Sequence, residues 1–353
     1  THDQNLFLWN GIRMFQTSHF FGLISAFNPL QATNISIYKN GSPAFYGESV
    51  SSLVDISTHT QIKDSCYNAI ALDMINANFM SMIKLSDRDR LQFSGRRTFS
   101  DIWKSPTFKD YQHRAFQNTT ITDVLQNQEV PVTSSEEFYF YDLSFSYQRK
   151  LNDSHELLVD GIGMENNLDV VQHTNTANRK GNLKQRNYGG GIELRSAWDE
   201  KNASEVHVYV SHYDLDAYNE SIENEQATHQ SNTILDKGIR LKYTHSLSSA
   251  FSTSAGYQFN EISIRNFDEV NVPVFSKNEK LASVSHIMAV QGNYASANGH
   301  TTATAGLRGN YFDKYKTLRL EPRLSFNQRI TDGLAFEVLG EQKSQTVSQI
   351  IDL

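Results

Sequence analysis

Residues 320–330 read Leu-Glu-Pro-Arg-Leu-Ser-Phe-Asn-Gln-Arg-Ile, and this stretch decides the predicted fold. Successive side chains of a β-strand point to opposite faces, so the alternation predicts a strand with two different faces. The apolar face carries Leu320, Pro322, Leu324 and Phe326, and the polar face carries Glu321, Arg323, Ser325 and Asn327. A slip of one residue would move the charges to the apolar face, so the register is strongly specified.

The same alternation recurs from about residue 138 to the end of the chain, in segments of roughly ten to fifteen residues. Short turns separate some of these segments, and Asn298-Gly299 and Asp332-Gly333 have the chemistry of β-hairpin turns. Three adjacent glycines at 189–191 interrupt one segment, where we expect a bend or bulge. We expect four longer polar connections to be loops: Ser100–Glu137, Val171–Gln185, Ala217–Thr233 and Asn266–Lys280.

This pattern is typical of a transmembrane β-barrel, which has short turns at one end, longer loops at the other and strands of about ten residues. Residues 66–99 fit the scheme with three further strands, at Cys66–Met74, Ala77–Leu85 and Leu91–Thr98. The count reaches about thirteen strands, an odd number, whereas bacterial single-chain barrels have an even number. The sequence therefore predicts an all-β membrane protein whose antiparallel barrel is partial.

Composition excludes several classes of protein. The chain has 353 residues, a net charge of −7 and one cysteine, Cys66. A nucleic-acid partner would call for a basic face, and a single cysteine rules out an intrachain disulfide. A transmembrane helix would need about 18 consecutive apolar residues, which the chain lacks. No arrangement of acid, base and nucleophile is recognisable and the 12 histidines are scattered, so we expect no enzyme, no cofactor and no metal site.

The first sixty residues have a different character. Short strands are expected at Leu6–Trp9, Ile35–Tyr38 and Val54–Ser57, with glycines and prolines between them, which indicates a compact α/β or β module. One turn stands out, and its residues are Lys39, Gly41, Pro43, Tyr46 and Gly47. The glycines permit positive φ or close approach to a wall, the proline stiffens the turn, the tyrosine offers a ring and a hydroxyl, and the lysine would place a charge in a polar lumen. The alternative is an ordinary tight turn of a soluble domain.

A family resemblance rests on three spaced stretches: LFLWNGI at 6–12, ISIYKNGSPAFYG at 35–47 and SSLVDI at 51–56. In this order they resemble the end of the plug domain of TonB-dependent outer-membrane receptors, in the form found in Bacteroidota. The resemblance implies that residues 1–60 are the C-terminal part of a small α/β plug domain and residues 61–353 the N-terminal part of a barrel of about 22 strands. The first half of the plug and its TonB box would precede Thr1.

The resemblance also implies a function. Receptors of this family take up a scarce nutrient, such as a ferric siderophore, cobalamin or a similar small ligand, across the bacterial outer membrane. Their partners are TonB of the inner-membrane energising complex, outer-membrane lipid and the ligand, which the sequence does not identify. Glu321, Arg323 and Asn327 are candidates to face the lumen.

Two alternatives remain open at the level of sequence. A passive porin or adhesin-type barrel would place residues 1–60 outside the lumen. A soluble all-β ligand-binding module would pack its apolar strand faces against each other in two sheets.

Overall fold

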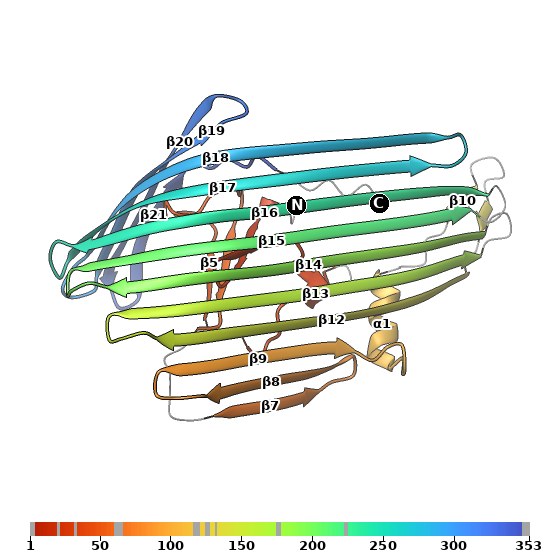
Figure 1. Ribbon diagram of the computed structural model, residues 1–353, viewed down its shortest axis with the longest axis horizontal. Coiled ribbons are helices and arrows are strands. Elements are labelled where there is room, and N and C mark those ends of the chain that lie inside the picture. The colour runs from red at the N-terminus through yellow and green to blue at the C-terminus, as the bar shows by residue number, and fades with distance from the viewer. Residues whose placement is uncertain are drawn as a thin grey trace.

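The computed structural model describes residues 4–19, 22–31, 34–59, 66–115, 121–123, 128–130, 133–173, 178–221 and 225–347. It consists of one large curved antiparallel sheet with small N-terminal elements on one side of it (Figure 1). No helix in these ranges is long and apolar enough to cross a membrane.

The large sheet has thirteen strands, and each lies beside its neighbour in the sequence. This agrees with the predicted all-β fold and strand count. In chain order the strands are β7 (Tyr67–Leu72), β8 (Asn76–Lys84), β9 (Asp89–Thr98), β12 (Thr133–Lys150), β13 (His155–His173), β14 (Asn178–Ala197), β15 (Asn202–Ser221), β16 (Gln226–Ser246), β17 (Phe251–Val270), β18 (Phe275–Ala295), β19 (Thr301–Phe312), β20 (Thr317–Thr331) and β21 (Leu334–Glu341).

The middle strands are longer than predicted, with 18 to 21 residues in each of β12–β18. The prediction of loops at 171–185, 217–233 and 266–280 was therefore wrong, because most of their described residues continue the ladder between neighbouring strands. These segments are polar, but a ladder of backbone hydrogen bonds does not require apolar side chains. The predicted short turns at Asn298-Gly299 and Asp332-Gly333 do connect strands, β18 with β19 and β20 with β21.

The glycines at 189–191 do not form a bulge, contrary to expectation. Residues of β14 pair with β13 and β15 in unbroken register through this stretch. A Cβ on Gly189 would lie 2.8 Å from Cγ2 of Ile12, and one on Gly191 would lie 3.3 Å from Cγ1 of the same residue. The missing side chains leave room for the N-terminal segment to approach the sheet, which is the second structural use of glycine inside a strand.

The connection between β9 and β12 is also more ordered than predicted. It contains helix α1 (Pro106–Ala115) and the short strands β10 (Ile121–Asp123) and β11 (Gln128–Val130). The Ser105 hydroxyl accepts a hydrogen bond from the Phe108 amide at 3.1 Å, as an N-cap does. Phe108 is buried in a cluster with Ile75, Phe138, Phe140 and Leu168, so the helix lies against one face of the large sheet.

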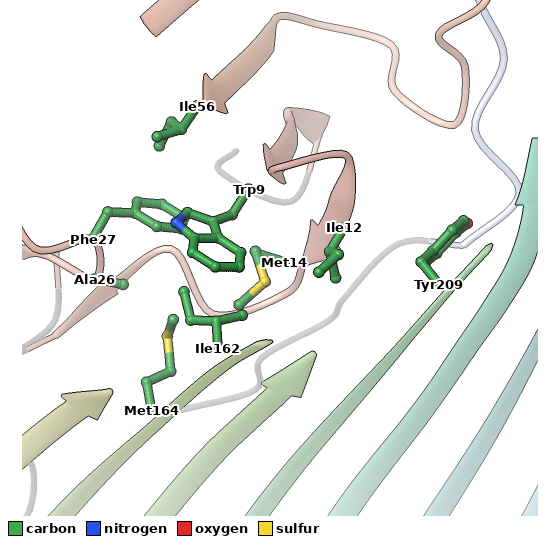
Figure 2. Close-up of a cluster of buried hydrophobic side chains, with 9 residues drawn as sticks. All are labelled: Trp9, Ile12, Met14, Ala26, Phe27, Ile56, Ile162, Met164 and Tyr209. Carbon is green, nitrogen blue, oxygen red and sulfur yellow. The ribbon is translucent and has the colours of Figure 1, made fainter. Parts of the chain in front are cut away.

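The N-terminal residues form a small sheet of their own. Its order is β2 (Ile12–Met14), β1 (Leu6–Trp9), β6 (Leu53–Ser57) and β5 (Asn34–Tyr38), with β1 parallel to β6. Strands β3 (Ser18–His19) and β4 (Ile24–Ser25) form a separate hairpin. The described residues from 4 to 59 contain no α-helix, so the β form of the expected module is the one observed. In Figure 2, Trp9 and Met14 of the small sheet point toward Ile162 and Met164 of β13.

The large sheet is apolar outside and polar inside along much of its length. On β15 the side chains of Val206, Val208 and Val210 are 37–47% exposed, whereas His207 and Tyr209 between them and Ser211 after them are buried. We call the large sheet the wall. Its buried side faces the small sheet, and we call that side the inward face. A soluble sheet buries its apolar face. The observed pattern is the reverse, so it contradicts a soluble all-β module whose apolar strand faces pack against each other in two sheets.

Candidate functional site at the contact between small sheet and wall

The turn at residues 39–47 lies against the inward face of strands β17–β21. Gly41 has a φ of +67°, and a Cβ there would be 2.9 Å from Cδ2 of Leu339. A Cβ on Gly47 would be 2.6 Å from the Arg308 guanidinium. Ala44 is fully buried, and its Cβ lies 2.8 Å from the position that a Cβ on Gly306 would take. Small residues on both sides therefore allow the turn and the wall to approach closely.

Arg323 holds the first half of the turn. Its Nη1 donates to the Pro43 carbonyl oxygen at 2.7 Å and to the Ser42 hydroxyl at 2.9 Å, and its Nη2 donates to Glu321 at 3.0 Å. Both Arg323 and Glu321 are buried. Ser42 in turn donates to Glu341 through its amide and its hydroxyl, at 3.0 and 2.8 Å. A buried ion pair needs such additional hydrogen bonds to offset its desolvation.

Arg308 and two glutamines hold the second half. Arg308 Nη1 donates to the Phe45 carbonyl oxygen at 3.2 Å and to Gln258 Oε1 at 3.1 Å. Gln258 donates to the same Phe45 oxygen at 2.6 Å, and Gln291 accepts from the Ala44 amide at 2.8 Å. The backbone of the turn is thus bound by side chains from several wall strands.

Tyr46 joins the turn to the small sheet. Its hydroxyl donates to Asp55 of β6 at 2.9 Å. Burial raises the pKa of Tyr46 well above its ordinary value, and the nearby Asp55 carboxylate adds to the effect. Burial also raises the pKa of Asp55. The pair fixes the turn relative to the sheet that carries it.

The remaining predicted site residues lie outside this network. Lys39 is exposed, and Asn327 is half-buried farther along β20 than Arg323. Among the described residues, neither of them holds the turn. The structure therefore brings together Gly41, Pro43, Tyr46, Gly47, Glu321 and Arg323.

A second contact, around β1 and β2, was not predicted. Arg240 donates to the Gly11 carbonyl oxygen at 2.6 Å, and its guanidinium lies 4.3 Å from the centre of the Tyr209 ring. Arg13 approaches Asp236 at 3.7 Å. In the sequence these wall residues are single polar positions in alternating strands, with nothing to mark them as partners of residues more than two hundred positions away. A polar cavity of about 40 Å³ between the two contacts has room for one or two water molecules.

The hairpin of β3 and β4 makes a third contact. His19 is fully buried, stacks on Phe140 at 3.9 Å between ring centroids and lies 3.4 Å from Asp142. Arg96 donates to Asp142 at 2.6 Å and to the Ser25 carbonyl oxygen at 2.7 Å. Burial lowers the pKa of His19, although its hydrogen bond with Asp142 opposes the shift.

The chain resembles known proteins in structure but not detectably in sequence. No protein-family model matches the chain, and no curated protein sequence matches it. Solved structures do match. The ferric enterobactin receptor PfeA of Pseudomonas aeruginosa aligns at a TM-score of 0.69 and 13% identity, over 98% of this chain and 55% of that one. The chain has the fold of a TonB-dependent receptor.

Two further matches support this assignment. The outer membrane transporter YddB of Escherichia coli aligns at a TM-score of 0.59 and 9% identity, over 93% of this chain and 51% of that one. The ferric yersiniabactin uptake receptor FyuA of Yersinia pestis aligns at 0.56 and 9%, over 96% and 69%. The TonB-dependent receptor fold therefore covers nearly all of this chain, which spans about half the length of most of these structures. These three proteins are receptors or transporters.

Proposed function

We propose that this chain belongs to a transporter that takes up a scarce nutrient across the bacterial outer membrane with energy delivered by TonB. Residues 1–60 are the C-terminal part of its plug, and residues 61–353 are the first part of its barrel. TonB would act through a plug segment that precedes this chain.

The observation that carries the proposal is the set of polar side chains on the inward face that bind the N-terminal module. Arg308 and Arg323 bind backbone oxygens of residues 42–47, and Arg240 binds that of Gly11. Each such hydrogen bond from a charged donor contributes about 1.5–3 kcal/mol net, because water replaces a lost partner. A plug held in this way is well ordered at rest and can still be displaced into an aqueous lumen.

The exposed apolar face supports the membrane location. Hydrocarbon accepts a barrel only if its outward side chains are apolar and its backbone groups are paired. The outward residues of β15 and its neighbours meet this condition, as do Ile239, Leu241, Met288 and Val290, which are 40–70% exposed.

The rival reading is a passive porin or adhesin. It predicts that residues 1–60 lie away from the inward face, whereas Ile12 and Phe45 fit against wall glycines on that face. We therefore favour the plugged transporter over an open pore. Two of the matched proteins are a ferric enterobactin receptor and a ferric yersiniabactin uptake receptor. For this transporter we propose a ferric siderophore, cobalamin or another small ligand.

Uptake by strains that lack this protein or TonB tests the proposal. We expect a deletion strain to lose growth on one scarce nutrient among iron chelates, cobalamin and small peptides, and a TonB-deficient strain to show the same loss. Growth that needs this protein but not TonB would leave only the passive pore. Heat-modifiable gel mobility after extraction in detergent would independently report the barrel.

A further inference from the structure

The polarity of the wall reverses along strands β15–β18. Near the short turns, the inward face carries polar residues such as His207, Arg240 and Gln258, which pair side by side across three strands. Toward the opposite ends of the same strands the inward face becomes aliphatic. Tyr213, Ile234, Ile264 and Leu281 form one row across the four strands.

Two further inward rows follow toward the ends of the strands. The first is Leu215, Asn232, Asn266 and Glu279, and the second is Ala217, Gln230, Asp268 and Lys277. Most of these side chains are aliphatic or amide. Lys277 pairs with Glu279 at 3.0 Å, and Gln230 donates to Asp268 at 3.2 Å, so the cation of these two rows has a carboxylate partner and Asp268 is bound by an amide.

The outward face carries a larger share of charged residues at this height. The outward row between the inward ones is Asp214, Thr233, Arg265 and Lys280. Arg186 and Lys184 of β14 also point outward, toward Glu165 at 3.3 and 2.9 Å. Charged groups at the strand ends therefore meet surrounding water, while the three inward rows carry only Glu279, Asp268 and Lys277 as charged side chains.

The N-terminal segment packs against the first of these inward rows. Phe15, which follows β2, packs with Tyr213, Ile234 and Ile262. Leu281 remains 37% exposed above them. Asn232 donates through Nδ2 to Asn266, while its own amide oxygen has no partner among the described residues. Aliphatic surface and unfilled amide capacity thus lie together directly above the module that we assign to the plug.

We call these three inward rows the chamber. We propose that the chamber binds an uncharged, amide-bearing ligand with aliphatic surface, either a short neutral peptide or a neutral metal chelate built on a peptide. The inference rests on the transporter function and names its substrate class. Amide side chains donate and accept, as peptide groups do, and the leucine and isoleucine rows bury aliphatic side chains. A polyanionic chelate would meet no unpaired cation in these three rows, and an oligosaccharide would find no exposed aromatic platform in them.

Calorimetric titration of the whole receptor in detergent tests the ligand class. The probes are a library of capped, uncharged pentapeptides, a neutral ferric tris-hydroxamate on a cyclic peptide, a triply anionic ferric tris-catecholate, and maltoheptaose. We expect one of the two neutral amide probes to bind most tightly, and which of them does so identifies the source. Tightest binding of the catecholate or the sugar, or no binding of either neutral amide probe, would overturn the proposal.

Paired variants locate the site. The double substitution Asn232→Lys with Asn266→Lys should weaken the neutral ligand at least about tenfold, because it removes amide hydrogen bonds and buries charge against the ligand. The matched control is Ser231→Lys with Ser263→Lys, which adds the same two charges on the same two strands but facing outward, and it should change affinity less than about twofold. Equal effects of the two pairs would contradict the assignment.

Salt dependence provides a measurement that needs no variant. Binding of a neutral ligand should change less than about twofold between low and high ionic strength, because there is no charge pair to screen. A loss of tenfold or more would contradict a neutral chamber. Binding in detergent does not require TonB, so failure of energised transport and failure of this inference are separate outcomes.

Discussion

The two halves of strands β15–β18 differ more from each other than any strand differs from its neighbour. Near the short turns, valines and isoleucines point outward and histidine, arginine and aspartate point inward. Toward the other ends, charges point outward and leucine and isoleucine point inward. The backbone ladder runs unbroken through both halves, so hydrogen bonding does not distinguish them.

The difference teaches what each surface touches. On β16 the outward side chains change from Leu241 and Ile239 to Lys237, which pairs with Glu261 at 3.1 Å. A charged pair on the outward face is costly in hydrocarbon but not in water. We therefore place the upper edge of the hydrocarbon layer at this pair. The lower inward face is polar because it holds the N-terminal module, and the upper inward face is neutral because, as we propose, it holds the ligand.

The largest expected effect comes from breaking the polar contacts of the inward face in the lower half. Arg323→Met removes the cation that binds Glu321, Ser42 and Pro43 and leaves the buried Glu321 carboxylate with the more distant Arg308, at 3.9 Å. We expect the free energy of unfolding to fall by about 3–5 kcal/mol, the usual cost of removing one partner of a buried ion pair. Urea unfolding in lipid vesicles measures it. A loss below about 1 kcal/mol would mean that water reaches Glu321.

The next effect tests the outward face. Val208→Arg places a charge in the middle of the exposed valine row of β15. It should destabilise the protein in a bilayer by about 2–4 kcal/mol, as for arginine at the lipid midplane. Ser231→Arg, outward but in the upper half, should change stability by less than about 0.5 kcal/mol. Equal costs at the two positions would remove the distinction between the halves.

A smaller effect concerns close approach. A Cβ on Gly256 would lie 2.7 Å from the Leu241 carbonyl oxygen and 2.9 Å from the Phe45 ring. Gly256→Ala should therefore cost about 1–3 kcal/mol by overpacking. Gly292→Ala is the control, because its Cβ would meet only Phe251 at an ordinary 3.4 Å. If the alanine at 256 were as well tolerated as the control, neither the Leu241 carbonyl oxygen nor the Phe45 ring would lie so close to this position.

The smallest effect is a dependence on pH. Burial lowers the pKa of His19, so the unfolded chain binds a proton more readily than the folded protein does. Stability should be complete above the ordinary histidine pKa of about 6.5 and should decrease as the pH falls below it. His19→Gln should flatten the fall in melting temperature between pH 7.5 and 5.5. The same slope in both proteins would show that His19 binds protons equally in the folded and the unfolded state.

The sequence predicted the strands whose two faces differ between apolar and polar. It did not predict the strand segments whose two faces are both polar. Residues 320–330 alternate between apolar and charged, and their register was readable. Within residues 228–233, the inward positions Thr228, Gln230 and Asn232 and the outward positions between them are all polar, which resembles a polar loop in one dimension. The glycines at 189–191 were noticed as unusual, but their reason is Ile12, which reaches them from a distant part of the chain.

The sequence by itself determined that the chain forms long alternating strands joined by tight turns behind a small glycine-rich module, because side-chain period and turn chemistry are local properties. Only the tertiary structure decided which wall residues hold that module and where the wall changes polarity. Arg308, Arg323 and Arg240 obtain their roles from carbonyl oxygens more than two hundred residues away. Such contacts depend on the curvature that brings distant strands around a common interior.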